Sequence, residues 1–157
     1  MLIFIKPILI DGLKNISSIA HGTSPRCFET DAGERGTLRL GANGDESSSP
    51  LHRKIFLQSL GIESDEVYMV KQVHSDRVHV LSDPALSGND IAGVEADAIV
   101  TVLAGKPIGV LTADCIPVIV YDARLHVLGV VHAGRKGTSE NILSKTVGVL
   151  RDTYGSH

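Results

Sequence analysis

Two histidines and one cysteine end short apolar segments of this 157-residue sequence: His74, Cys115 and His132. Strand ends present side chains from a rigid backbone into a cleft, so three such residues can share one site. Two imidazoles and one thiolate suit Zn²⁺, and three protein ligands with one open position are typical of catalytic zinc sites. The residue types therefore predict a zinc centre formed by these three side chains.

The spacing of these residues leaves simpler interpretations open. Their intervals match no short zinc-finger pattern. A lone cysteine in an apolar strand is often a small buried hydrophobic residue, which is the alternative for Cys115. Asp114 precedes that cysteine and is a candidate catalytic residue that orients a ligand, or else a carboxylate that caps the loop.

The segment from Gly134 to Thr138 leads from an apolar strand into a predicted helix. Backbone N–H groups at a helix start can face an anion. Gly134 and Gly137 permit close backbone approach, and Arg135 or Lys136 adds a positive charge. These four residues are therefore candidates for binding a phosphate or a carboxylate. The alternative is an ordinary strand-to-helix turn with solvated basic side chains.

Short apolar runs must hold these side chains in place. Four lie close together, at residues 98–103, 108–111, 116–121 and 127–132. Their nearly continuous Val and Ile content predicts strands that are buried on both faces, and such a sheet needs helical cover. Earlier in the chain, residues 67–73 alternate apolar and polar side chains and residues 77–81 form a further run, so both are predicted strands.

Two helices are predicted to supply the cover. The first runs from Ser49 to about Leu60, because Pro50 suits the first helical position and Gly61 a helix stop. The second runs over residues 138–154. Its apolar stripe consists of Ile142, Leu143, Val147, Leu150 and Tyr154. The pattern predicts an α/β protein with a mixed, buried β-sheet covered by helices.

The composition limits the classes of function. A net charge of −3 without a concentrated basic patch gives no reason to expect a nucleic-acid partner. No apolar run approaches the ~20 residues of a membrane-spanning helix, so no membrane partner is expected. Two cysteines cannot form a disulfide framework, and the first residues lack a signal-peptide pattern. We therefore expect a cytoplasmic protein.

Four ordered segments resemble the motifs of the YfiH-type family, also called the multicopper polyphenol oxidoreductase or laccase-like family. They are Lys71–His74, Glu95–Ala98, Thr112–Val118 and His132–Gly134, and the resemblance extends from about residue 21 to residue 154. It implies a layered sandwich of the YfiH type, with zinc bound by the His, Cys and His of three motifs. Residues 1–157 are thus expected to form a single YfiH-like domain that lacks the C-terminal part of the family.

The resemblance also implies an activity on purine nucleosides. Family members phosphorolyse adenosine, inosine or methylthioadenosine and hydrolytically deaminate adenosine, so a nucleoside and phosphate are the expected ligands. Copper-dependent polyphenol oxidation is the family's competing assignment. It requires several His-rich copper sites, whereas the sequence has seven mostly unclustered histidines.

Two further alternatives stay open. One is a cysteine hydrolase or deamidase in which Cys115 is the nucleophile and His132 its base, by fold analogy with the catalytic domain of cytotoxic necrotizing toxins. The other is an inactive, truncated relative. It is suggested by the shorter C-terminus and by the Arg135-Lys136 pair, which stands where the family usually has Trp-Arg. The sequence leaves the oligomeric state open.

Overall fold

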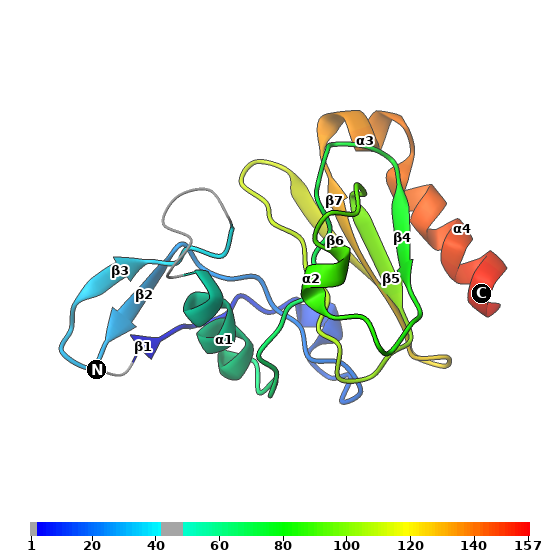
Figure 1. Ribbon diagram of the computed structural model, residues 1–157. Helices are drawn as coiled ribbons and strands as arrows, with labels where there is room; N and C mark the ends of the chain where they lie inside the picture. The colour runs from blue at the N-terminus through cyan, green and yellow to red at the C-terminus, as the bar shows by residue number, and fades with distance from the viewer. Residues whose placement is uncertain (1–2, 42–48) are drawn as a thin grey trace. The chain divides into compact units, whose positions relative to one another are not determined.

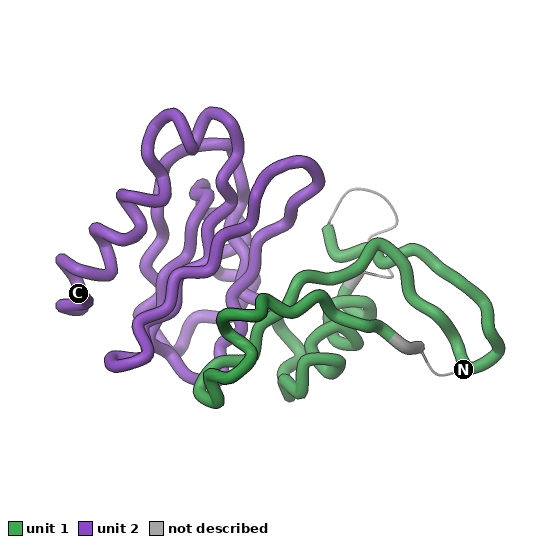
Figure 2. Tube along the Cα trace, turned by 180° about the vertical axis from the view of Figure 1, so that it is seen from behind, with its two compact units in different colours: residues 1–66 green, residues 67–157 purple. Residues whose placement is uncertain are grey.

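The chain divides into two compact units, residues 1–66 and residues 67–157 (Figure 2). The computed structural model describes residues 3–41 and 49–157. The single domain expected over residues 1–157 stays a prediction.

The first unit contains a small antiparallel sheet and one longer helix. Strands β1 (Ile3–Phe4), β2 (Cys27–Thr30) and β3 (Arg35–Thr37) are paired in that order. A 3₁₀ turn, η1 (Asp11–Leu13), and helix α1 (Ser49–Ser59) complete the unit. Gly61 has a φ of +71°, a left-handed conformation that glycine adopts without strain. The predicted first helix and its stop at Gly61 are therefore confirmed.

The second unit is built on a four-stranded mixed sheet in the order β4-β5-β7-β6 (Figure 1). The strands are β4 (Val78–Leu81), β5 (Ala98–Thr101), β6 (Ile116–Asp122) and β7 (Val127–Ala133). β4 and β5 are parallel, whereas β5 with β7 and β7 with β6 are antiparallel. This mixed sheet with its helices confirms the predicted α/β class.

Burial differs between the central and the edge strands of this sheet. Every residue of β5 is buried, as are most of β7, because both strands have a neighbour on each side. β6 lies at the edge, and its first residue, Ile116, is 66% exposed. The prediction that the run at 116–121 is buried on both faces is therefore wrong, because apolar content alone does not distinguish an edge strand from a central one.

Two of the predicted strands are single bridges. Residues 67–73 and 108–111 contribute only the bridges Tyr68↔Ile108 and Lys71↔Glu95. The backbone N–H of Tyr68 donates to the carbonyl of Pro107, and that of Lys71 donates to the carbonyl of Val94. The two segments pair with each other and with Glu95, outside the four-stranded sheet. Neither the alternating pattern of residues 67–73 nor the apolar run at 108–111 therefore marks a strand of that sheet.

The predicted helix at 138–154 is two helices, α3 (Arg135–Ser139) and α4 (Ile142–Tyr154). Asn141 separates them with a φ of +63°, and Gly155 ends α4 in the left-handed region. The buried face of α4 consists of Ile142, Thr146 and Leu150. Leu143 and Val147 of the predicted stripe are instead 42% and 46% exposed, so that part of the prediction is wrong.

The core lies on both faces of the sheet. Helix α4 covers one face and packs against β4, β5 and β7, where the side chains of Ala98, Val100 and Val131 meet Ile142 and Leu150 (Figure 1). The other face buries a second cluster. Its members are Tyr68, Val70, Leu81, Ile91, Ala96 and Ile99.

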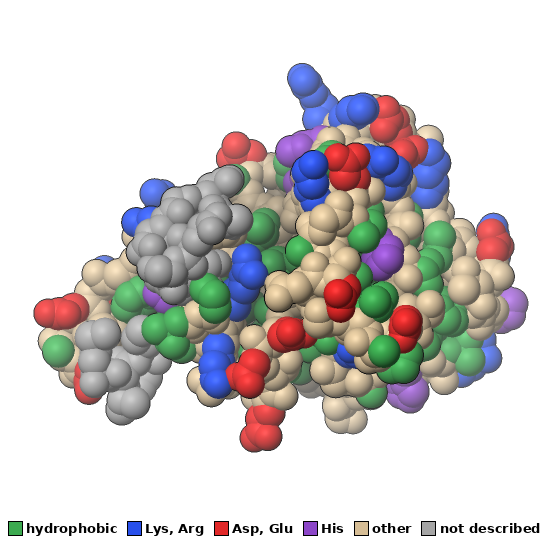
Figure 3. Space-filling model, in the orientation of Figure 1, with side chains coloured by type: hydrophobic (Ala, Val, Ile, Leu, Met, Phe, Trp, Pro, Cys, Tyr) green, Lys and Arg blue, Asp and Glu red, His purple; other side chains and the backbone are tan. Residues whose placement is uncertain are grey.

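The second face is covered by loops and by the short helix α2 (Gly88–Ile91). Ser87 and Asp90 close the start of α2 as a capping box. Among the described residues, no helix has the length and the apolar character needed to cross a membrane. On the face drawn in Figure 3, Lys and Arg side chains lie interspersed with Asp and Glu side chains.

Candidate metal centre

The sheet topology brings three chain segments together at one end of the strands. β5 begins directly after Asp97, β6 begins directly after Cys115, and β7 ends just after His132. Because β7 is antiparallel to both neighbours, the end of β7 lies beside the starts of β5 and β6, as the pairs Ala98↔Val131 and Ile116↔Ala133 show. Residues that are 17 and 35 positions from His132 along the chain therefore meet at one place.

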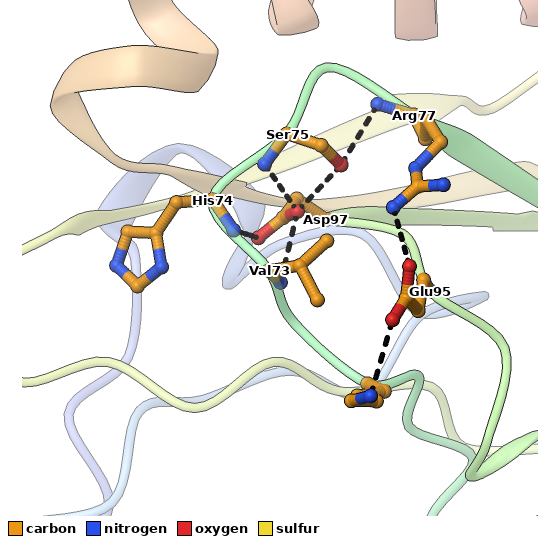
Figure 4. A network of polar contacts seen from close by, with 7 residues as sticks. Val73, His74, Ser75, Arg77, Glu95 and Asp97 are labelled. Carbon is orange, nitrogen blue, oxygen red and sulfur yellow. Dashed lines mark hydrogen bonds and ion pairs between the residues drawn. The ribbon is translucent and has the colours of Figure 1, made fainter.

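His74 reaches the same place from the loop that precedes β4. Its backbone has a φ of +57°, in the left-handed region that non-glycine residues rarely adopt. The backbone N–H of His74 donates to Oδ1 of Asp97 at 3.0 Å, and Figure 4 shows the loop wrapped around this carboxylate. A hydrogen bond to the residue before β5 thus stabilises the strained backbone of His74.

The structure brings His74, Cys115 and His132 together, as predicted. One ligand atom of each lies within 4.8 Å of the other two, and the two imidazole rings stand nearly perpendicular with centroids 4.9 Å apart. Two metal–ligand bonds of about 2.0–2.3 Å span at most about 4.6 Å, and a tetrahedral site brings ligand atoms to about 3.5 Å. The widest pair needs to close by about 1 Å around an ion.

Gly134 leaves the space between these side chains open. A Cβ at this position would lie 3.1 Å from Sγ of Cys115, 3.1 Å from Cδ2 of His74 and 3.7 Å from Cε1 of His132. The glycine backbone therefore lies against all three side chains. Together with the soft N₂S donor set, this makes the residues present fit a zinc-sized ion with one open position.

Exposure increases across the site. His132 is 3% exposed, Cys115 is half-buried and His74 is exposed. A ligand from solvent therefore approaches on the side of His74, while His132 is fixed within the protein. This asymmetry is what a catalytic centre needs, because one coordination position must stay accessible.

Asp97 is the buried charge that links two of these residues. It is 0% exposed and accepts hydrogen bonds from the backbone N–H groups of Val73, His74 and Ser75 and from the Ser75 hydroxyl. Its Oδ1 also lies 2.8 Å from Nδ1 of His132. Burial acts to raise the pKa of Asp97, but the hydrogen bonds from His132, Ser75 and Val73 outweigh it and lower this pKa below its ordinary value.

Sequence reasoning assigned no role to Asp97, although a signal was present. The residue lies between Ala96 and Ala98 at the start of a strand of apolar side chains. A charged residue in such a run is almost never fully buried unless it is paired. That signal indicates a partner, but the sequence does not say which one.

An exposed ion-pair network supports the same loop from outside. Glu95 accepts from Nζ of Lys71 at 3.1 Å and from Nη2 of Arg77 at 2.9 Å, as Figure 4 shows in part. The hydrogen bonds from Lys71 and Arg77 lower the pKa of Glu95. Because these side chains are exposed, the network ties the two ends of the loop together with only a modest energy.

The other predicted site residues lie around this centre. Asp114, Arg135 and Lys136 are exposed. Nζ of Lys136 lies 4.0 Å from Oε1 of Glu140 in an ion pair. Their predicted roles in catalysis and anion binding stay predictions. The backbone N–H groups that were expected to face an anion belong to α3, which is five residues long and begins at Arg135.

Gly137, the second glycine of the predicted anion segment, has a packing role. It is buried in α3, and a Cβ there would lie 2.7 Å from the backbone oxygen of Ser75. Only a residue without a Cβ lets α3 approach the loop that carries His74 this closely. Gly134 and Gly137 thus both serve the contacts of the centre.

The fold is similar to that of a solved structure, the hypothetical protein YfiH of Bacillus licheniformis. The TM-score is 0.66 at 27% sequence identity, and the match covers 76% of this chain and 47% of that one. YlmD of Geobacillus stearothermophilus has the same fold, with a TM-score of 0.65 at 20% identity over 75% of this chain and 46% of that one. The expected YfiH-type architecture is therefore confirmed.

Residues 21–157 match the family described as multi-copper polyphenol oxidoreductase laccase. The chain belongs to this family, which confirms the resemblance found in the sequence. A purine nucleoside phosphorylase of Corynebacterium glutamicum is 32% identical over 108 residues, which are 69% of this chain and 43% of that protein. An adenosine deaminase of an unknown prokaryotic organism is 38% identical over 110 residues, 66% of this chain and 42% of that protein. The chain spans less than half the length of these relatives.

Proposed function

We propose that this chain carries the zinc centre of a purine nucleoside phosphorylase that also deaminates adenosine. The observation that supports the proposal most strongly is the convergence of His74, Cys115 and His132 within 4.8 Å. The names of the relatives supply the substrate class, purine nucleosides and adenosine in particular, and the resemblance to the family adds inosine and methylthioadenosine as candidates. Neither observation alone specifies both the metal and the reaction.

The three proposed zinc ligands have different roles in such a site. Zn²⁺ bound by three protein ligands supplies a Lewis acid that activates water near neutral pH, as attack on the adenine ring carbon requires. Cys115 and His132 hold their donor atoms from the rigid ends of β6 and β7. His74 presents its ring on the solvent side, where the nucleoside has access.

Phosphorolysis also requires a place for phosphate. Arg135 and Lys136 follow the centre directly in α3, and both are exposed. We propose that they attract the anion by charge, and that Gly134 and Gly137 let the backbone approach it. Arg135 is the better candidate for binding phosphate, because Lys136 already pairs with Glu140 and a guanidinium binds phosphate bidentately.

A second candidate, a cysteine hydrolase or deamidase, is favoured by a different observation. A ring nitrogen of His132 lies within 4.8 Å of Sγ of Cys115, and Asp97 contacts Nδ1 of the same ring. A nucleophile, a base and a carboxylate in this order are the arrangement of Cys–His hydrolases. This chemistry has no use for His74, so His74→Ala separates the two candidates.

Copper-dependent phenol oxidation is the function in the family description. A multicopper oxidase needs several copper sites. Within residues 3–41 and 49–157, a single group of His, Cys, Asp and Glu side chains has the spacing to hold a metal ion. We therefore favour zinc, and a phenol substrate is an outcome that the activity assay also covers.

The test is an assay of the purified chain with adenosine and phosphate, followed by chromatography of the products. We expect adenine, inosine and hypoxanthine, and we expect a metal chelator or His74→Ala to abolish their formation. Iodoacetamide-sensitive turnover that survives both the chelator and His74→Ala would favour the cysteine hydrolase. Zinc-loaded protein that leaves every purine nucleoside unchanged would indicate an inactive relative and refute the proposed activity.

A further inference from the structure

We propose that Asp97 is the positioning residue of the metal centre: its one carboxylate fixes both the tautomer of His132 and the backbone of His74. The inference rests on the proposed zinc site and concerns how the chain prepares that site. It assigns a function to a residue that does not itself bind the metal. The two oxygens of Asp97 have different partners.

The two oxygens of this carboxylate serve two chain segments. Oδ1 accepts from the N–H of His74 at 3.0 Å and lies 2.8 Å from Nδ1 of His132. Oδ2 accepts from the N–H groups of Val73 and Ser75 at 3.2 and 2.6 Å and from the Ser75 hydroxyl at 2.8 Å. The carboxylate thus contacts only donors, which an ionised acid satisfies and no neutral group of that shape does.

The contact with Oδ1 determines which nitrogen of His132 carries the proton. An ionised carboxylate is a pure acceptor, so Nδ1 must be the N–H donor. The proton is then absent from Nε2 of the neutral ring, whose lone pair is free for a metal. A histidine ligand usually has such a partner on its second nitrogen, and that partner fixes the ring and raises its basicity.

The same carboxylate holds His74 through the backbone. The left-handed conformation at His74, with φ of +57°, is strained in a residue other than glycine. Three consecutive N–H groups, from Val73 to Ser75, point at Asp97 and stabilise this turn (Figure 4). Without the carboxylate, these three N–H groups lose their acceptor, and the turn loses the hydrogen bonds that stabilise it.

Asparagine at position 97 keeps the shape and breaks this arrangement. Its –NH₂ group must replace either Oδ1 or Oδ2, so it faces N–H donors in both orientations. At the Oδ1 position it also favours the tautomer of His132 with the proton on Nε2, which cannot bind a metal. Asp97→Asn is therefore the informative substitution, as a carboxylate-to-amide change is for the tautomer in hydrolase triads.

A matched control lies in the same strand. Thr101 is 2% exposed, and its hydroxyl donates to the carbonyl of Leu81 at 2.8 Å. The same hydroxyl accepts from the N–H of Leu103 at 3.0 Å. Thr101→Val therefore removes two hydrogen bonds of β5 at the end opposite the centre. It lowers the stability of the fold through the same kind of loss, so it shows what a purely structural defect does to metal affinity.

The experiment is a zinc titration of the full chain by competition with a coloured chelator, combined with ¹⁵N NMR of the histidine rings. We expect Asp97→Asn to weaken zinc binding by about 10- to 100-fold and to move the His132 proton from Nδ1 to Nε2. Thr101→Val should leave both readouts unchanged. Cobalt-loaded Asp97→Asn should also show a weakened thiolate-to-metal absorption band.

Two results would overturn the inference. One is an Asp97→Asn variant with the zinc affinity of the wild type and an unchanged His132 tautomer. If the wild type binds zinc and is active, this result leaves the proposed function in place. The other is equal losses in Asp97→Asn and Thr101→Val. A wild type that binds no zinc refutes the proposed function instead, and the inference with it. If Asp97→Asn does not fold, ¹⁵N NMR of the metal-free wild type decides instead, and a His132 proton on Nε2 and not on Nδ1 contradicts the inference.

Discussion

Gly134 lies against Cys115 so closely that a Cβ at position 134 would be 3.1 Å from Sγ. The same Cβ would lie 3.1 Å from the ring of His74. We predict that Gly134→Ala weakens zinc binding by about tenfold or more, as is typical when a group that supports metal ligands is changed. The chain should still fold, because both contacts are with side chains that can rotate. Zinc titration and circular dichroism of the same sample measure the two effects, and unaltered affinity would contradict the role given to this glycine.

Gly137→Ala should destabilise the fold itself. Its Cβ would lie 2.7 Å from the backbone oxygen of Ser75, so α3 or the loop must move. We expect the free energy of unfolding to fall by about 1–3 kcal/mol, the usual cost of overpacking. Thermal unfolding of the metal-free chain measures it. The control is Gly148→Ala in α4, where a Cβ meets nothing within 4 Å and helix propensity predicts a gain of about 1 kcal/mol.

Leu150→Ala tests which face of α4 packs against the sheet. Leu150 is 3% exposed, whereas Leu143 is 42% exposed. Leu150→Ala should lower the free energy of unfolding by about 2–5 kcal/mol, and Leu143→Ala should change it by about 0.5 kcal/mol or less. Urea unfolding of both variants provides the comparison. Equal losses would mean that the buried face includes Leu143.

The ion pairs of Glu95 should make stability depend on pH in the acid range. Lys71 and Arg77 lower the pKa of Glu95, so the folded state holds this carboxylate ionised at a pH where the unfolded chain begins to protonate it. The stabilisation is therefore present above the unfolded pKa of about 4.3 and is lost as the pH falls through the folded value. The difference in Tm between the wild type and Glu95→Gln should shrink towards zero on acidification. A constant difference from pH 7 to pH 3 would argue against the ion pairs.

The sequence predicts the positions of Cys115 and His132 well, and the reason is local. Both residues border apolar runs whose ends coincide with strand ends, and the antiparallel pairing of β6 with β7 follows from their closeness in the chain. The break between α3 and α4 at Asn141 was not predictable in the same way. Residues 138–154 keep one helical period, and only the left-handed backbone of Asn141 interrupts it.

The arrangement around His74 depends on contacts that are distant in the sequence. Asp97 lies 23 residues from His74 and 35 residues from His132, and no periodicity connects them. Predicting the loop at 73–75 requires knowing that a buried carboxylate at the start of β5 needs donors. Burial is a property of the folded sheet, which is why the sequence indicated the ligands but not the residue that orients them.

X-ray absorption at the zinc edge of the purified, zinc-loaded chain tests the central claim most directly. His74, Cys115 and His132 predict one sulfur at about 2.3 Å and two imidazole nitrogens at about 2.0–2.1 Å, with a light atom in the fourth position. Cys115→Ser should remove the sulfur signal and most of the bound zinc. A stoichiometric zinc site without sulfur, or a chain that binds no zinc under these conditions, would contradict the claim.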